Sequence, residues 1–224
     1  MKKPSLTSFL IAFLLAAAVC THGEEEEVKD SNGNPVKIYT KYFIKVVETE
    51  SNMGGGLIPS PIRNPTCPFG ITQTINPYQP VTPVSFEYPY ISKLTFNTSS
   101  YINIRIRPEL WAWCTDYSTL WAVDFSSPAA KEPAIIISGR PGSPESAFKI
   151  EKATKAHTYK LTTLFGTVGT IPSPFFHEPH LIATNDEAKT LIVEFVKVGD
   201  VTTATTTTTT SPVEKLGLRM FPFH

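Results

Sequence analysis

The chain has 224 residues, with 20 basic and 20 acidic side chains and no net charge at pH 7. A balanced charge gives no excess of basic residues to attract the phosphates of nucleic acid, so we expect no nucleic-acid partner. The body of the chain, about residues 28–199, suits one domain by the usual length of ~100–200 residues.

The N-terminus predicts a secretory signal. Lys2 and Lys3 precede an apolar run over residues 9–19, and the small residue Gly23 follows shortly afterwards. A charged segment, a short apolar segment and a small residue at the cleavage point are the parts of a signal peptide. The run is shorter than the ~18 residues of a spanning helix, and no other segment is long or apolar enough. We expect residues 1–23 to be removed, and an extracellular, vacuolar or endoplasmic-reticulum-derived location.

Turn residues followed by an extended run come soon after this signal. Asp30 and Asn32 can bond their own backbone, Gly33 supplies a positive φ, and Pro35 fixes φ. The same stretch carries, in order, Val28, Asp30, Gly33, Val36, Tyr42 and Ile44. At all of these positions it resembles the signature of the plant Kunitz family, the soybean-trypsin-inhibitor type. The resemblance implies a protein that offers loops to partners rather than an enzyme.

Short apolar, β-branched segments recur along the chain between Pro, Gly, Asn and Ser, and we find no convincing long amphipathic helix. The predicted strands cover residues 41–47, 70–75, 83–88, 93–97, 101–107, 120–124, 134–138, 147–152, 157–164, 166–171, 181–184 and 191–198. Many short strands with regular turns favour a sandwich or a barrel, and periodicity does not choose between them. The Kunitz resemblance implies an all-β fold, a β-trefoil of about twelve strands with pseudo-threefold symmetry.

A faint internal repeat agrees with that implication. The segments 42–44, 102–104 and 148–150 each place two apolar residues two positions apart. This alternation turns one face of each strand inward, so we expect equivalent core strands. Large aromatic side chains dominate apolar burial, and we expect the following to lie in the core or its cap. They are Trp121, Phe165 and Phe195.

The cysteines predict one disulfide. Removal of the signal deletes Cys20 and leaves Cys67 and Cys114. Because the secretory route is oxidising, we expect these two to pair, although a buried free pair is the alternative. A crosslink closing so long a loop contributes roughly 3–4 kcal/mol by restricting the unfolded chain.

The Kunitz resemblance implies an inhibitory loop between the first cysteine and the second, which occupies the cleft of a serine or papain-like cysteine endopeptidase. Its predicted residues are Glu87, Tyr88, Pro89, Tyr90, Ile91, Ser92, Lys93 and Leu94. Pro89 restricts the loop, which lowers the entropy cost of binding. Lys93 is the only basic residue between Arg63 and Arg105, so it is the candidate anchor for a trypsin-type protease. Ser92 competes for that position, and a solvated lysine at a strand end is the alternative role.

Within the Kunitz family, the chain most resembles the water-soluble chlorophyll-binding proteins of crucifers. The motifs that carry this resemblance are residues 54–59 (GGGLIP), 67–74 (CPFGITQT), 77–80 (PYQP) and 110–111 (LW). It implies that the carbonyl of Pro59 ligates the magnesium of chlorophyll, and that Gln79 and Trp111 bond or pack the ring. Magnesium prefers oxygen ligands, so a carbonyl suits it. Such a carrier is expected to form a homotetramer when loaded, whereas the inhibitor needs no cofactor.

One departure from the chlorophyll-binding group concerns the apolar side chains that would line the pigment site. That group has a bulky apolar residue before the cysteine and leucine after the next proline, where this chain has Thr66 and Phe69. Polar Thr66 weakens an apolar wall. The alternative for the Gly-Gly-Gly segment and Pro59 is a turn without a ligand.

Other motifs carry less chemistry. No Gly-x-Ser-x-Gly elbow, P-loop or His-Glu-x-x-His occurs, and we expect no catalytic residue. His177 and His180 flank Glu-Pro, but a metal site needs three or four ligands in fixed geometry, and a turn is the expected role. Asn97 begins a glycosylation sequon, Asn-Thr-Ser.

The C-terminus changes character after the expected domain, residues 24–200. Residues 202–210 are threonine except for Ala204, and the last residues, 213–224, are more apolar. A threonine run cannot bury enough apolar area to offset its ordering entropy. We therefore expect residues 201–224 to be a disordered tail with an apolar extension.

Overall fold

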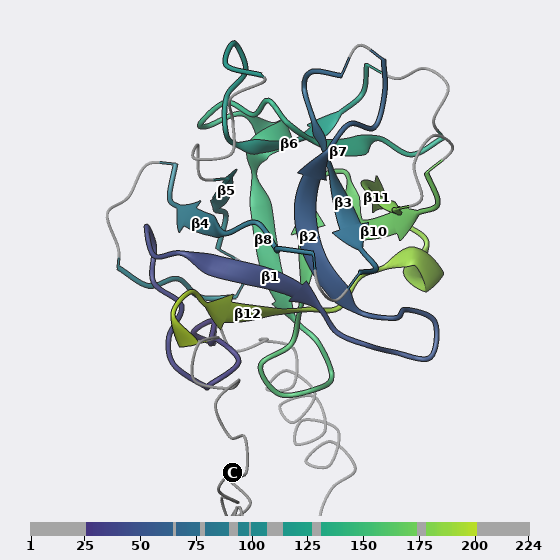
Figure 1. Ribbon diagram of the computed structural model, residues 1–224. Helices are drawn as coiled ribbons and strands as arrows, with labels where there is room; N and C mark the ends of the chain where they lie inside the picture. Colours follow the sequence, from purple (N-terminus) through teal and green to yellow (C-terminus); the bar gives the residue numbers. More distant parts are fainter. Residues whose placement is uncertain are drawn as a thin grey trace, which may run out of the picture.

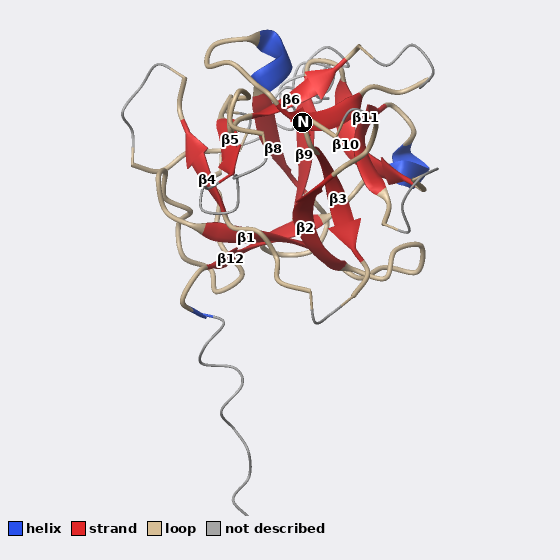
Figure 2. Ribbon diagram, turned by 45° about the horizontal axis from the view of Figure 1, so that its top comes forward, coloured by secondary structure: helices blue, strands red, loops and turns tan. Residues whose placement is uncertain are grey.

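The computed structural model describes residues 26–64, 66–76, 79–89, 94–98, 100–106, 114–126, 131–173 and 178–200. The expected signal and the expected tail lie outside the described residues. Within them the chain is all-β, with short 3-10 helices only (Figures 1 and 2). Among the described residues, we find no helix with the length and hydropathy of a membrane span.

Twelve strands form one hydrogen-bonded sheet. They are β1 (Tyr42–Val46), β2 (Gly55–Ser60), β3 (Gly70–Thr74), β4 (Val84–Glu87), β5 (Asn103–Ile106), β6 (Trp121–Asp124), β7 (Ala134–Ile137), β8 (Phe148–Lys152), β9 (Tyr159–Thr163), β10 (Gly166–Ile171), β11 (His180–Thr184) and β12 (Val193–Lys197). The 3-10 helices are η2 (Pro144–Ser146) and η3 (Glu187–Lys189).

The prediction of strands is confirmed for most segments and wrong at two places. Residues 94–98 form no strand, because Thr95 and Asn97 make only isolated bridges. Their partners are Lys37 and Glu27, which lie in residues 26–41 before β1, called here the N-terminal loop. The strand β2 was not predicted, since its glycines have low β propensity.

One set of strands closes into a barrel. Strand β1 pairs with β4, β4 with β5, β8 with β9, β9 with β12, and β12 with β1. The ring is completed by the bridge between Ile102, just before β5, and Phe148 of β8. Figure 1 shows β1 and β12 side by side across the base of this barrel.

The remaining strands form hairpins at one end of the barrel. These are β2–β3, β6–β7 and β10–β11. The hairpins contact one another through β3–β7, β7–β11 and β11–β3. The loops that leave these hairpins are therefore gathered at the same end of the molecule.

The predicted repeat lies in the core. Tyr42 and Ile44, Ile102 and Ile104, and Phe148 and Ile150 are all at most 1% exposed. Trp121 and Phe195 are buried as predicted, and Phe165 is half-buried against the same cluster. Alternation along each strand thus supplies the inward face of the barrel.

The N-terminal loop is fastened to the barrel by buried polar groups. Asp30 is 1% exposed, and its Oδ1 accepts from the backbone N–H groups of Asn32 (3.0 Å) and Asn34 (2.9 Å). The hydroxyl of Tyr42 accepts from Lys37 N at 3.0 Å, and burial raises the pKa of Tyr42. The signature residues therefore serve to build this turn and to dock it on the core.

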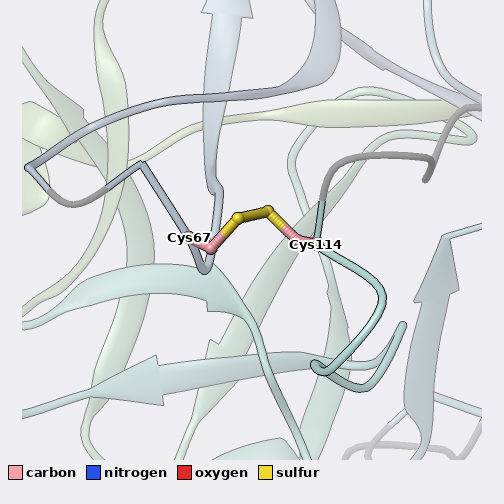
Figure 3. Close-up of a disulfide and its surroundings, with 2 residues drawn as sticks. All are labelled: Cys67 and Cys114. Carbon is pink, nitrogen blue, oxygen red and sulfur yellow. A yellow bond between two sulfur atoms is a disulfide. The ribbon is translucent and has the colours of Figure 1, made fainter.

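The predicted disulfide is confirmed. Cys67 and Cys114 are bonded with Cα atoms 5.7 Å apart. Figure 3 shows the bond linking the segment before β3 to the segment before β6. Since both segments lie among the hairpin loops, the crosslink holds two of these loops together.

Candidate functional sites

The predicted inhibitory loop connects β4 to β5. The structure describes its flanks, Glu87–Pro89 and Leu94, while residues 90–93, including Ser92 and Lys93, lie outside the described residues. Leu94 is 77% exposed. The contacts of the described flanks therefore show how the two ends of the loop are attached to the barrel.

An ion pair holds the first flank. Arg105 on β5 contacts both carboxylate oxygens of Glu87, with Nε–Oε1 at 2.6 Å and Nη2–Oε2 at 3.0 Å. The Nη1 of Arg105 also donates to Thr119 Oγ1 at 2.5 Å. Bidentate arginine–carboxylate pairs add geometric specificity as well as energy. Arg105 thus fixes the end of β4 where the loop begins.

The N-terminal loop supports both flanks. Tyr39 N donates to Phe86 O at 3.0 Å on the incoming strand, and Ile38 N donates to Leu94 O at 2.9 Å on the outgoing side. Tyr88 Oη lies 3.4 Å from Thr95 O and links the two flanks of the loop. These supports were missed in the sequence, because main-chain donors leave no residue-type signal. Main-chain contacts therefore fix the two described ends of the loop.

The second candidate site is the carbonyl of Pro59 on β2. Pro59 lies opposite Ile71, and Leu57 lies opposite Gln73. Leu57 O accepts from Thr82 N outside the hairpin, and Gln73 N donates to Pro179 O on its other side. Antiparallel pairs alternate between hydrogen-bonded and non-bonded types, so the pair two residues along, Pro59 with Ile71, also points its polar groups outward.

The Pro59 carbonyl is therefore directed away from β3, to the side of β2 on which Leu57 O accepts from Thr82 N. Strand β2 pairs with β1 only at Gly55 and Gly56, so Pro59 lies beyond that contact. Proline is tolerated there because its missing N–H would face away from the ladder. The alternative of a simple turn for Pro59 is wrong, since residues 55–60 form a strand. An outward carbonyl oxygen fits a magnesium ligand.

The glycines before Pro59 have structural reasons of their own. Gly55 has φ +114°, and a Cβ there would lie 2.0 Å from Thr74 O. A Cβ on Gly56 would lie 2.2 Å from Val81 Cγ2. Buried Gln73 exchanges side-chain hydrogen bonds with Asn52, and its Nε2 donates to Gly54 O at 2.5 Å. The glycines are thus needed for close backbone approach and are not themselves evidence of pigment.

Gln79 is held beside the same hairpin. Thr74 Oγ1 donates to Gln79 Oε1 at 2.9 Å, which leaves the amide N–H₂ as the donor of that side chain. Trp111 lies outside the described residues. Thr66 is exposed, whereas Phe69 is half-buried and packs against the core cluster. Of the two departures from the chlorophyll-binding group, only Thr66 therefore lies on the surface.

Only one member of the histidine pair, His180, lies in the described part of the chain. His177 lies outside it, and no group of three or more potential ligands is found within it. His180 is buried on β11, and burial lowers its pKa. Glu178 instead accepts from Thr72 Oγ1 at 3.1 Å.

The sequon residue Asn97 is half-buried. Its carbonyl accepts from Ser100 N at 3.2 Å, and the buried hydroxyl of Thr98 accepts from Glu26 N at 3.1 Å. Glycosylation of Asn97 stays a prediction.

Two known proteins are similar to this chain over most of its length. A protein of Arabidopsis thaliana described as Kunitz trypsin inhibitor 2 is 53% identical over 209 residues, covering 92% of this chain and 97% of that protein. The solved structure of a water-soluble chlorophyll protein from Brassica oleracea var. botrytis with chlorophyll b is 61% identical, with a TM-score of 0.71. That match covers 77% of this chain and 99% of the other.

More distant comparisons support the fold. Soybean trypsin inhibitor has a TM-score of 0.63 at 22% identity, over 77% of this chain and all of that one (100%). A family model described as "Trypsin and protease inhibitor", of the legume Kunitz type, matches residues 28–167, more than half of the sequence. The chain therefore belongs to the plant Kunitz family of protease inhibitors.

Proposed function

We propose that this chain is an endopeptidase inhibitor of the plant Kunitz type, acting on a serine or papain-like cysteine protease. The observation that carries the proposal is that both flanks of the β4–β5 loop are held in place. The Arg105–Glu87 ion pair holds one flank, and the hydrogen bond from Ile38 N to Leu94 O holds the other. A substrate-like loop inhibits when it enters a protease cleft and loses little entropy there. The 53% identical Kunitz trypsin inhibitor 2 agrees with this role.

Titration against a protease panel tests the proposal. We expect the purified protein to inhibit at least one of trypsin, chymotrypsin, subtilisin and papain with one-to-one stoichiometry. Residual activity measured at increasing inhibitor gives the endpoint, and heat-unfolded protein provides the control. Full activity of all four proteases at a tenfold molar excess of folded protein would contradict the proposal.

We propose chlorophyll binding as a second candidate function, because the Pro59 carbonyl points away from β3, outside the β2–β3 ladder. The 61% identical water-soluble chlorophyll protein supports it. When bound, chlorophyll would offer its magnesium to the Pro59 oxygen. The Gln79 amide would donate to a ring carbonyl, and Trp111 would supply apolar packing.

Reconstitution with detergent-solubilised chlorophyll tests the pigment proposal. We expect a green species, larger than the apoprotein, on gel filtration. Thr66→Phe should increase uptake, since apolar area removed from water contributes about 25 cal/mol per Å². Thr154→Phe, an exposed threonine in the turn after β8, is the matched control and should change nothing. Colourless protein from both wild type and Thr66→Phe, beside a loaded reference binder, would contradict the proposal.

We further propose that the domain is a β-trefoil over residues 24–200, that residues 1–23 are a cleaved signal, and that residues 201–224 form a disordered extension. The closed barrel and its set of hairpins support the trefoil. The Cys67–Cys114 bond supports passage through an oxidising secretory route. On this proposal the protein binds partners and has no catalytic activity of its own.

A further inference from the structure

A groove lies where the loop between β1 and β2 meets the ends of β3 and β10. Ile171 at the end of β10 pairs with His180 of β11, and His180 pairs with Thr72 of β3. Figure 1 shows these three strands together on one side of the molecule. The groove has a volume of about 230 Å³, and its apolar walls are formed by Met53, Ile75, Ile171, Pro172 and Pro179.

Two side chains of this groove are large, apolar and exposed. Met53 is 77% exposed on the β1–β2 loop, and Ile75, just after β3, is 47% exposed. Single exposed apolar residues are common, but apolar residues that line one groove often mark a binding surface. Methionine is also frequent at surfaces that accept varied partners. The volume is below the ~300–1,000 Å³ of sites for small-molecule ligands, so it suits one large side chain of a partner.

The loop that carries Met53 is tied to β3 by side-chain amides. Buried Gln73 donates from Nε2 to Asn52 Oδ1 at 2.6 Å and to Gly54 O at 2.5 Å. Asn52 Nδ2 donates back to Gln73 Oε1 at 3.1 Å. The residues on both sides of Met53 are therefore fixed, and a wall that is held before binding lowers the entropy cost of a complex.

The rim of the groove is acidic. Residues 49–52 close a tight turn through paired main-chain hydrogen bonds, with Glu50 exposed at its tip. Glu48 is exposed beside Gly54, where an added Cβ would lie 3.5 Å from Glu48 Cβ. Glu178 lies on the opposite side, just before β11. Among the described residues, none that lines the groove is basic and none forms an ion pair with these carboxylates.

We propose that this groove binds a partner protein through an apolar side chain flanked by lysine or arginine. The apolar side chain fills the space between Met53 and Ile75, and its basic neighbours pair with Glu48 and Glu50. An anchor that fills a pocket supplies most of the affinity of such a contact, and complementary charge supplies specificity and a fast approach.

This surface is distinct from the β4–β5 loop and does not rest on the inhibitory function. The groove adjoins the Val46 end of β1, where β1 pairs with Gly55 of β2. Strand β4, from which the inhibitory loop departs, pairs with β1 at the other end, at Tyr42. The two surfaces therefore belong to different ends of the same strand.

Binding of a short, fluorescein-labelled peptide of alternating leucine and lysine to the full chain tests the proposal. Fluorescence anisotropy measures the dissociation constant. Peptides in which glutamate replaces every lysine, or serine replaces every leucine, should bind about tenfold more weakly or worse. Raising the salt from about 0.1 M to about 1 M should also weaken binding of the lysine peptide, because salt screens exposed charges.

Variants of the groove locate the site. Met53→Ser, Ile75→Ser and Glu50→Lys should each raise the dissociation constant of the lysine peptide about tenfold, which corresponds to about 1.4 kcal/mol. Leu164→Ser, at a side chain 58% exposed in the β9–β10 turn, and Glu151→Lys, at an exposed position of β8, are the matched controls and should change nothing. The urea midpoints should equal that of wild type, because all of these side chains are exposed.

Several results would overturn the proposal. They are failure of wild type to bind the lysine peptide, equal binding of the lysine and glutamate peptides, and wild-type binding by all three groove variants. A dimer of wild type that Met53→Ser dissociates, seen by sedimentation velocity, would assign the groove to a second copy of the chain. If the peptide binds only after deletion of residues 213–224, the occupant is that segment. Either outcome overturns an external partner.

Discussion

Lys93→Ala should weaken trypsin inhibition by about 2–4 kcal/mol if trypsin is the target, which is about thirtyfold to a thousandfold in the inhibition constant. Lys93 is the sole basic residue of the predicted loop, and a trypsin-type pocket binds one basic anchor. Truncating that anchor leaves the acidic group of the pocket buried without a partner, so most of the binding energy is lost. Inhibition constants from progress curves measure the effect.

Two neighbouring variants make the result specific. Lys93→Arg keeps the positive charge and should retain inhibition, whereas Ser92→Ala should have a small effect. If Ser92→Ala no longer inhibits the protease while Lys93→Ala inhibits it as well as wild type, the anchor is Ser92. In that case the target is a protease that does not select basic residues.

Gly55→Ala should destabilise the fold by about 3–5 kcal/mol, the sum of overpacking and backbone strain. The added Cβ would lie 2.0 Å from the Thr74 carbonyl oxygen, so β2 must move away from β3. The residue would also be forced to φ +114° with a side chain. Urea denaturation followed by tryptophan fluorescence measures the free energy of unfolding.

Gly199→Ala separates these two causes. Gly199 has φ +110°, close to that of Gly55, but nothing lies within 4 Å of its added Cβ. The free energy of unfolding of Gly199→Ala should therefore fall only by the cost of backbone strain, about 1–3 kcal/mol. Equal losses in the two variants would show that the contact with Thr74 is unimportant.

The strand β2 illustrates what residue-level patterns miss. Three consecutive glycines predict a turn or flexible chain, because glycine has low β propensity and high conformational freedom. In the structure they are required by close backbone approach: Gly55 meets Thr74 and Gly56 meets Val81. That demand comes from neighbours 19 residues (Thr74) and 25 residues (Val81) further along the chain, so no local rule contains it.

The segment after the inhibitory loop shows the opposite error. Its β-branched and aromatic residues predict a strand over 93–97, yet Thr95 and Asn97 meet only isolated partners in the N-terminal loop. A strand needs one neighbour over several residues, and here the bridge partner changes from Lys37 at Thr95 to Glu27 at Asn97. Composition alone therefore overestimates the pairing.

Features that depend on neighbours along the chain, or on counting residues, could be predicted before the fold was known. Turn chemistry located the N-terminal loop, alternation located the inward faces of the barrel, and two remaining cysteines identified the disulfide. The recurring short apolar segments and their turns indicated the all-β class. The supports of the inhibitory loop could not be predicted in this way, because their contacts join Glu87 to Arg105 and Ile38 to Leu94, which are distant in the sequence. The direction of the Pro59 carbonyl was likewise decided by the hydrogen-bond alternation of the β2–β3 ladder, a property of two paired strands that neither strand carries alone.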